Sequence, residues 1–75
     1  MDDNYQDLAN AIIILATKDY RRVLKRLMKL PSSDSTKNEI MQLEAFFQSD
    51  YFKLLTSLDG EMLIEKLKQE VEDDC

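Results

Sequence analysis

The first thirty residues contain neither glycine nor proline, and their apolar side chains recur at the spacing of an α-helix. One apolar seam advances in alternating steps of four and three, through Ala9, Ile13, Ala16, Tyr20, Val23, Leu27 and Leu30. Such a seam lets a helix pack lengthwise against one or two others at a shallow angle. The pattern predicts one long helix over residues 4–29, which ends at Pro31 and the Ser/Asp cluster that follows it.

Three shorter helices are predicted after this break. Thr36 and Glu39 have the spacing of a capping box, which predicts a helix over residues 36–48. Ser49 is the expected N-cap of a helix over 50–57, and Asp59 that of a helix over 61–72. The apolar residues that these helices carry are Ile40, Leu43, Phe46, Phe47, Tyr51, Phe52, Leu54, Leu55, Leu63, Ile64, Leu67 and Val71.

Short helices do not persist alone in water, so the three must lean on the long one. We therefore expect an all-α fold, a small helical bundle in which residues 1–75 form one domain. At this size a single core is marginal, and a disulfide, a metal or a second chain is often recruited. The chain has one cysteine, Cys75, and no histidine, which excludes an internal disulfide and a structural zinc site. Of these three sources of extra stability, only a second chain is then available.

The same composition argues against catalysis. Without histidine, acid-base or nucleophilic chemistry would depend on tuned carboxylates, lysines or Cys75, and such groups work best in a formed pocket. The acids of "SLDGE" lack the alternating oxygen ligands of a calcium loop. We predict a non-enzymatic protein that has no cofactor and no metal.

The N-terminus and the apolar runs bear on location. The chain opens with acidic residues rather than a basic region, which argues against a signal peptide. Its longest apolar run, residues 11–16, is too short to span a bilayer. The single thiol suits a reducing compartment. We expect a cytoplasmic protein with no membrane association.

Six cations fall within an arc of about 140° on the long helix when successive residues are placed 100° apart. We call this set the basic stripe: Lys18, Arg21, Arg22, Lys25, Arg26 and Lys29. It could be a solvated face, a contact for a protein partner, or a site for nucleic acid or an anionic membrane. Direct nucleic-acid binding is disfavoured because the net charge of the chain is −5 and no aromatic side chain lies on the stripe.

Charge is segregated along the chain. Residues 18–29 carry a net +5 and the remainder −10. The acidic tail, residues 70–75, includes Glu70, Glu72, Asp73 and Asp74 near a helix C-terminus, where the macrodipole disfavours anions. We expect it to fray unless it meets cations, for which the basic stripe is a candidate in the same chain or a second copy. With Glu39, Glu44, Asp50 and Asp59, these acids could imitate phosphates, or they could serve only solubility.

The N-terminal half of the long helix is apolar almost all round. Ala11, Ile14 and Leu15 lie on the same side of the helix as the basic stripe, while Ile12 and Ile13 cover the opposite side. A helix of this kind is normally covered on more than one side. A helix from a second copy of the chain or from a partner protein is the candidate cover, and a homodimer is expected. The alternative is that the loops and the fourth helix bury this surface within one chain.

Three blocks, residues 8–27, 46–55 and 58–67, carry a resemblance that spans nearly the whole chain. They include "LANAIIILATKDYRRVLKRL" and "EAFFQSDYFKLLTSLDGEMLIEKL". In these the sequence resembles small helical proteins carried by prophages and integrative conjugative elements of Gram-positive bacteria. The resemblance brings no catalytic residue. It implies a bacterial host and a protein that binds and modulates host machinery, of which anti-CRISPR proteins are the best-known class.

Two functions follow as expectations. The first is a binding module of a phage or mobile element that engages a host protein or protein–nucleic-acid complex, specifically as an inhibitor of an RNA-guided nuclease. The second is a small nucleic-acid-binding accessory or regulatory protein that uses the basic stripe, Lys18 to Lys29.

Overall fold

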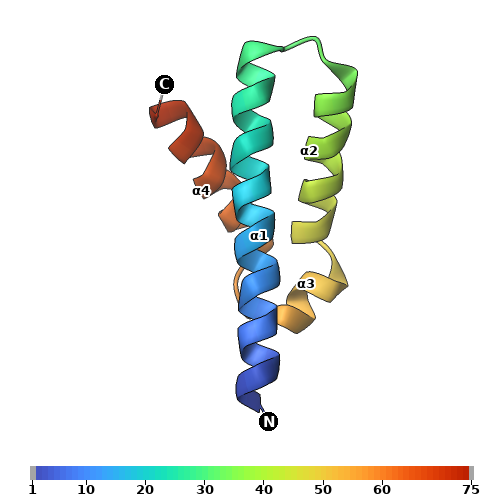
Figure 1. Ribbon diagram of the computed structural model, residues 1–75, viewed down its shortest axis with the longest axis vertical. Helices are drawn as coiled ribbons and strands as arrows, with labels where there is room; N and C mark the ends of the chain where they lie inside the picture. The colour runs from blue at the N-terminus through green and yellow to red at the C-terminus, as the bar shows by residue number, and fades with distance from the viewer. Residues whose placement is uncertain (1, 75) are drawn as a thin grey trace.

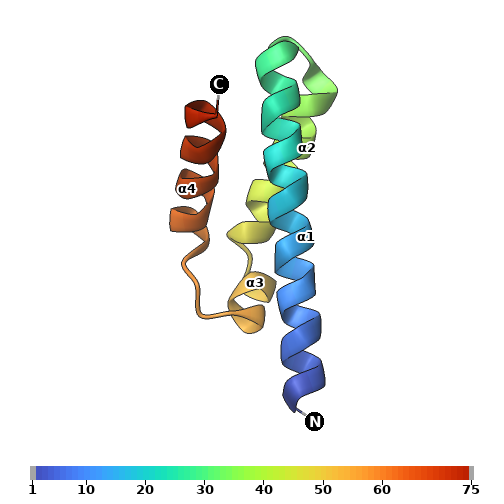
Figure 2. The same ribbon diagram turned by 60° about the vertical axis from the view of Figure 1, so that its left-hand side comes forward.

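The computed structural model describes residues 2–74, and every regular element in that range is an α-helix. The four helices are α1 (Asp2–Lys29), α2 (Asp34–Phe47), α3 (Asp50–Leu55) and α4 (Gly60–Asp73). Helix α1 runs the length of the molecule, α2 returns beside it, and α3 lies against its N-terminal half (Figure 1). Helix α4 then packs on α1 and α2 (Figure 2). This confirms the predicted all-α fold, with a long N-terminal helix and shorter helices packed along it.

Aromatic side chains from three helices form the centre of the core. Tyr20 of α1, Phe47 of α2 and Phe52 of α3 are each at most 1% exposed. The ring of Phe47 lies 5.7 Å from those of Tyr20 and Phe52, edge to face in both pairs. This geometry is favoured by the quadrupoles of aromatic rings. The other buried apolar residues are Ala9, Ile13, Val23, Leu24, Ile40, Leu55, Ile64, Leu67 and Val71.

Side-chain caps begin the three shorter helices. Ser49 accepts a hydrogen bond from the Phe52 amide, and Asp59 accepts hydrogen bonds from the amides of Glu61 and Met62, as predicted. The capping box at Thr36 was wrong. Ser33 caps α2 by accepting from the Thr36 amide, so the helix begins at Asp34.

Thr36 does not cap α2 because its side chain is buried in the core. It is 1% exposed, and its hydroxyl lies 2.9 Å from the Ser33 hydroxyl. Glu39 pairs with Arg26 of α1 instead of turning back to Thr36. A buried hydroxyl needs a hydrogen-bond partner, and the Ser33 cap supplies one.

The other helix ends differ from prediction by small amounts. Helix α1 begins at Asp2 rather than near residue 4, and α4 extends from Gly60 to Asp73. Helix α3 ends at Leu55 rather than residue 57, because Thr56 adopts an extended backbone. Three apolar residues assigned to the seam or to α3 are more than half exposed: Leu30, Tyr51 and Leu54.

Gly60 allows the start of α4 to approach the end of α2 closely. A Cβ atom built at Gly60 would overlap the backbone carbonyl oxygen of Phe47. Because the obstacle is backbone, it cannot rotate away as a flexible side chain would. The only glycine of the chain is therefore required for close packing.

One polar network joins α1, α2 and α4. The Tyr20 hydroxyl donates a hydrogen bond of 2.6 Å to the Glu44 carboxylate, which also lies 3.6 Å from the Lys68 ammonium. Burial raises the pKa of the Tyr20 hydroxyl above its ordinary value, and the hydrogen bond and the charge of Glu44 raise it further. The phenol is therefore held neutral, with its polar end at the edge of the core.

Helix α1 extends beyond the rest of the bundle at its N-terminal end (Figures 1 and 2). The molecule measures 45 Å along its longest axis, and a helix of 28 residues spans about 42 Å. No helix within residues 2–74 combines the length and apolar character needed to cross a membrane.

Candidate functional site

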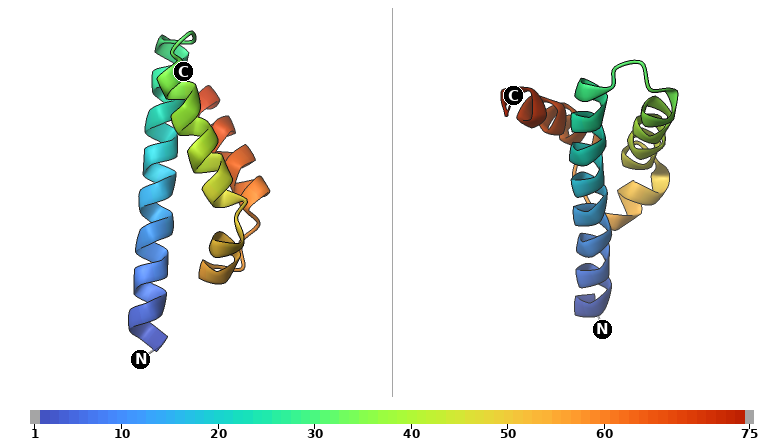
Figure 3. Two further views of the ribbon diagram at one scale, coloured as in Figure 1. Left: turned by 90° about the vertical axis from the view of Figure 1, so that its right-hand side faces the viewer. Right: turned by 45° about the horizontal axis from the view of Figure 1, so that its top comes forward.

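The outer face of α1 is the most distinctive surface of the molecule. Helices α2 and α4 flank the C-terminal half of α1, whereas only α3 reaches the N-terminal half (Figure 3). Every residue predicted for self-association is exposed here: Ala11, Ile14 at 52% and Leu15 at 62%. Leu8, at 62%, extends the same surface toward the N-terminus. We call Leu8, Ala11, Ile14 and Leu15 the apolar strip.

The basic stripe continues the apolar strip toward the C-terminus of α1. Four of its six cations make ion pairs in the same chain. Arg21 pairs with Glu70 at 2.9 Å, and Lys25 lies 3.7 Å from Asp74. The remaining two pairs are Arg22 with Asp19 at 3.0 Å and Arg26 with Glu39 at 3.1 Å. Within residues 2–74, Lys18 and Lys29 form no ion pair.

Despite these ion pairs, the stripe keeps a net positive charge and stays exposed to solvent. The six cations and their four acidic partners carry a local charge of +2. The paired cationic side chains are 40–67% exposed, so water and salt screen each pair. The cations therefore stay available to an anionic partner that offers more charge than a single carboxylate.

The acidic candidates separate into two groups. Glu70 and Asp74 face the basic stripe of the same chain, and α4 stays helical to Asp73. Glu72 and Asp73 are exposed, with no ion pair within residues 2–74. Cys75, the last residue of the predicted tail, lies outside the described residues.

The four other acids proposed as phosphate mimics make local contacts. Glu39 and Glu44 pair with Arg26 and Lys68, and Asp50 lies 3.9 Å from Lys53. Asp59 caps α4. These carboxylates belong to α2, α3 and the N-cap of α4, and each is engaged in a contact within its own chain.

A shallow hollow of about 300 Å³ lies on the basic stripe. Its lining consists of cationic side chains alone: Arg22, Lys25, Arg26 and Lys29. Their spacing of three, one and three places them on one side of the helix. Three of these four charges are paired with Asp19, Asp74 and Glu39, so an anionic group such as a carboxylate or a phosphate would bind here in competition with those acids.

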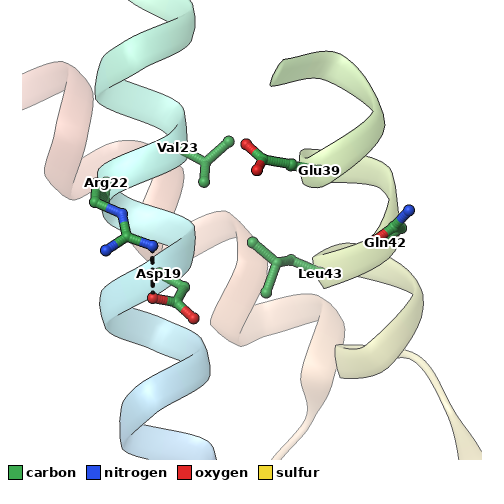
Figure 4. A pocket seen from close by; sticks show the side chains of 6 residues that line it. All are labelled: Asp19, Arg22, Val23, Glu39, Gln42 and Leu43. Atoms are coloured by element: carbon green, nitrogen blue, oxygen red, sulfur yellow. Dashed lines mark hydrogen bonds and ion pairs between the residues drawn. The ribbon is translucent and has the colours of Figure 1, made fainter. Parts of the chain in front are cut away.

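A second recess of about 240 Å³ opens between α1 and α2 (Figure 4). Val23 and Leu43 are its apolar lining residues, and Asp19, Arg22, Glu39 and Gln42 complete the lining. In Figure 4, Arg22 is turned along α1 toward Asp19, which it binds. The recess holds no thiol, hydroxyl or imidazole that could act as a nucleophile. Among the described residues, no group of three or more Asp, Glu, His or Cys is placed to hold a metal ion.

Two features of this surface escaped the sequence prediction. Leu8 belongs to the apolar strip, and its spacing of three and seven residues from Ala11 and Leu15 is a signal that could have identified it. The pairing of the stripe with Glu39 from α2 has no such signal, because it depends on how the two helices dock. Comparison of the chain with protein-family models, curated proteins and solved structures gave no match.

Proposed function

We propose that this protein is a non-enzymatic binding module of a phage or mobile element, which uses the basic stripe to engage an anionic surface of host machinery. In its specific form, the proposal is that the protein inhibits an RNA-guided nuclease in the bacterial cytoplasm. The observation that carries it is the all-cationic hollow formed by Arg22, Lys25, Arg26 and Lys29.

The state of these cations supports binding rather than a purely structural role. Each ion pair of the stripe is half-exposed, and such pairs contribute between 0 and about 1 kcal/mol to stability. The fold therefore depends little on six clustered charges. An acidic surface on a partner could displace the four weak pairs and gain from all six cations at once.

The second candidate is a nucleic-acid-binding accessory protein that uses the same hollow. Six cations on one helix face would attract a phosphate backbone without regard to sequence. The chain as a whole opposes this, since its net charge of −5 repels a polyanion outside the stripe. Glu70 and Asp74 beside the stripe add to that repulsion. Binding to a protein patch of limited size is therefore favoured over binding along a duplex.

The test uses purified RNA-guided nucleases with guide RNA and target DNA. We expect the wild-type protein to slow target cleavage by at least one nuclease of a panel, and the double variant Arg22→Glu/Arg26→Glu to lose that effect. The matched control is Lys37→Glu/Lys66→Glu, which makes the same change of charge at exposed residues outside the stripe. Circular dichroism verifies that both variants are folded.

Duplex DNA and RNA are titrated in parallel at low and physiological salt. If the wild type inhibits no nuclease but binds duplex with a steep salt dependence that Arg22→Glu/Arg26→Glu removes, the second candidate replaces the first. If neither activity depends on the stripe, both proposals fail.

A further inference from the structure

Three residues of the apolar strip and three of the basic stripe lie on a single heptad seam. Leu8, Ala11, Leu15, Lys18, Arg22 and Lys25 follow one another in steps of three and four. This spacing is the one by which two helices pair along their length. On α1 the first half of the seam is apolar and the second half is cationic, while the chain's own core occupies the opposite side of the helix. All six residues of the seam are exposed in the part of the chain that the structure describes.

We infer that two copies of this chain pair through α1 in an antiparallel arrangement. The charge of the seam selects the direction. A parallel pair would set Lys18, Arg22 and Lys25 against the same residues of the second copy, and like charges in contact are destabilising. An antiparallel pair sets the cationic half of each helix beside the N-terminal half of the other. That half carries three Asp and no cation among residues 2–7.

One register satisfies the seam and its flanks together. With the two-fold axis at residue 13, Ala11 lies opposite Leu15 of the second copy, and Leu8 lies opposite the aliphatic stem of Lys18. On one flank, Ile14 then lies against Ile14 of the second copy. Both Ile14 and Leu15 are more than half exposed in the single chain, so this register gives them the cover that they lack.

The same register brings opposite charges together. Asp7, which makes no ion pair within residues 2–74, comes opposite Arg21 of the second copy. Arg21 already binds Glu70 through Nε, at 2.9 Å. A guanidinium has five N–H donors and can bind a second carboxylate. The small side chain of Ala11 at the centre of the seam permits close approach of the two helices.

The inference does not require the proposed binding function, although both use the basic stripe: the pairing is argued from the exposed apolar strip and from the charges along α1. It also predicts what becomes of the basic stripes. In an antiparallel pair they lie at opposite ends, and the N-terminal half of the second copy lies along Lys18, Arg22 and Lys25. A nuclease or nucleic-acid partner would then meet two separate basic regions, each reduced mainly to Arg26 and Lys29.

Light scattering of the full chain tests the pairing. We expect a mass of twice the 8.8 kDa chain at high micromolar concentration. Leu15→Glu should reduce this to the mass of one chain. The matched control Met41→Glu makes the same change at a residue of α2 that is 66% exposed, and should leave the dimer intact. A single-chain mass for the wild type, or a dimer of a folded Leu15→Glu variant, would overturn the inference.

The direction of pairing is tested without any change in the seam's apolar residues. A spin label at Lys29→Cys, in a Cys75→Ser background, should give an inter-label distance of about 48 Å in the antiparallel pair, since the two positions are 32 residues apart along the axis. A parallel pair would give less than about 20 Å, because the helices would lie side by side. The short distance, or no dipolar coupling at all, would exclude the antiparallel arrangement.

Discussion

The two halves of α1 have similar helical backbones but different surroundings. From Tyr20 to Leu27 the helix is held between α2 and α4, and four cations on its outer side are tied to acids. From Tyr5 to Leu15 it contacts α3, through a hydrogen bond from the Tyr5 hydroxyl to the Leu54 carbonyl, and leaves apolar side chains in water. The C-terminal half supplies Tyr20, Val23 and Leu24 to the core. The N-terminal half adds Ala9 and Ile13 to the core, and its exposed apolar side chains form the surface through which we propose that a second copy binds.

Truncation of one leucine in each half tests this contrast most directly. Leu24→Ala, at a residue 9% exposed, should lower the free energy of unfolding by about 3 kcal/mol because it leaves a cavity in the core. Leu15→Ala, on the same helix at 62% exposure, should change that of the monomer by less than about 0.5 kcal/mol. Urea denaturation at low micromolar concentration measures both. Equal losses would mean that the two halves are equally buried.

Gly60→Ala should have the next largest effect. The new methyl group meets the Phe47 carbonyl oxygen, so α4 must move away from α2, at a cost of about 2 kcal/mol. Thermal unfolding followed by circular dichroism detects the loss. Glu61→Ala, one residue later on the exposed side of α4, is the control and should unfold close to wild type. A Gly60→Ala protein as stable as wild type would contradict the close packing.

Tyr20→Phe removes the hydrogen bond from the core half of α1 to Glu44. We expect a loss of about 1.5 kcal/mol at neutral pH, since the acceptor is charged. Tyr5→Phe, which removes an exposed hydrogen bond from the other half, is the matched control and should cost less.

Wild type and Tyr20→Phe should also differ in how their stability depends on alkaline pH. The pKa of Tyr20 is raised in the folded protein above its ordinary value of 10.0, so the unfolded state loses this proton first. The stability that Tyr20 contributes is complete below pH 10 and declines as the pH rises above it. Urea denaturation across this range should show a steeper fall for wild type than for Tyr20→Phe. Parallel curves would contradict the buried neutral phenol.

The smallest effects belong to the surface ion pairs. Arg26→Gln should lower the free energy of unfolding by less than about 1 kcal/mol, because both Arg26 and Glu39 are about half exposed. The loss should shrink further in molar salt, which screens the pair. A loss of several kcal/mol would show that the basic stripe holds α1 to α2, and the case for a stripe kept for a partner would weaken.

Local chemistry made most of the fold predictable. The apolar seam and the absence of glycine and proline define α1, and the side chains of Ser49 and Asp59 define the starts of α3 and α4. The start of α2 was misassigned because Ser33 and Thr36 are both good caps. What distinguished them was the burial of Thr36, which depends on contacts with the rest of the bundle.

The sequence by itself determined the helices, the basic stripe and the apolar surroundings of Ile14, because helical periodicity alone fixes which residues share a face. Only the tertiary structure decided how these faces are used. The docking of α4 brought Glu70 to Arg21, and that of α2 brought Glu39 to Arg26 and Glu44 to Tyr20. These contacts join residues 13 to 49 positions apart, and their formation depends on packing angles that no local pattern encodes. The same packing left Leu8, Ile14 and Leu15 exposed, since the three shorter helices cover one side of α1.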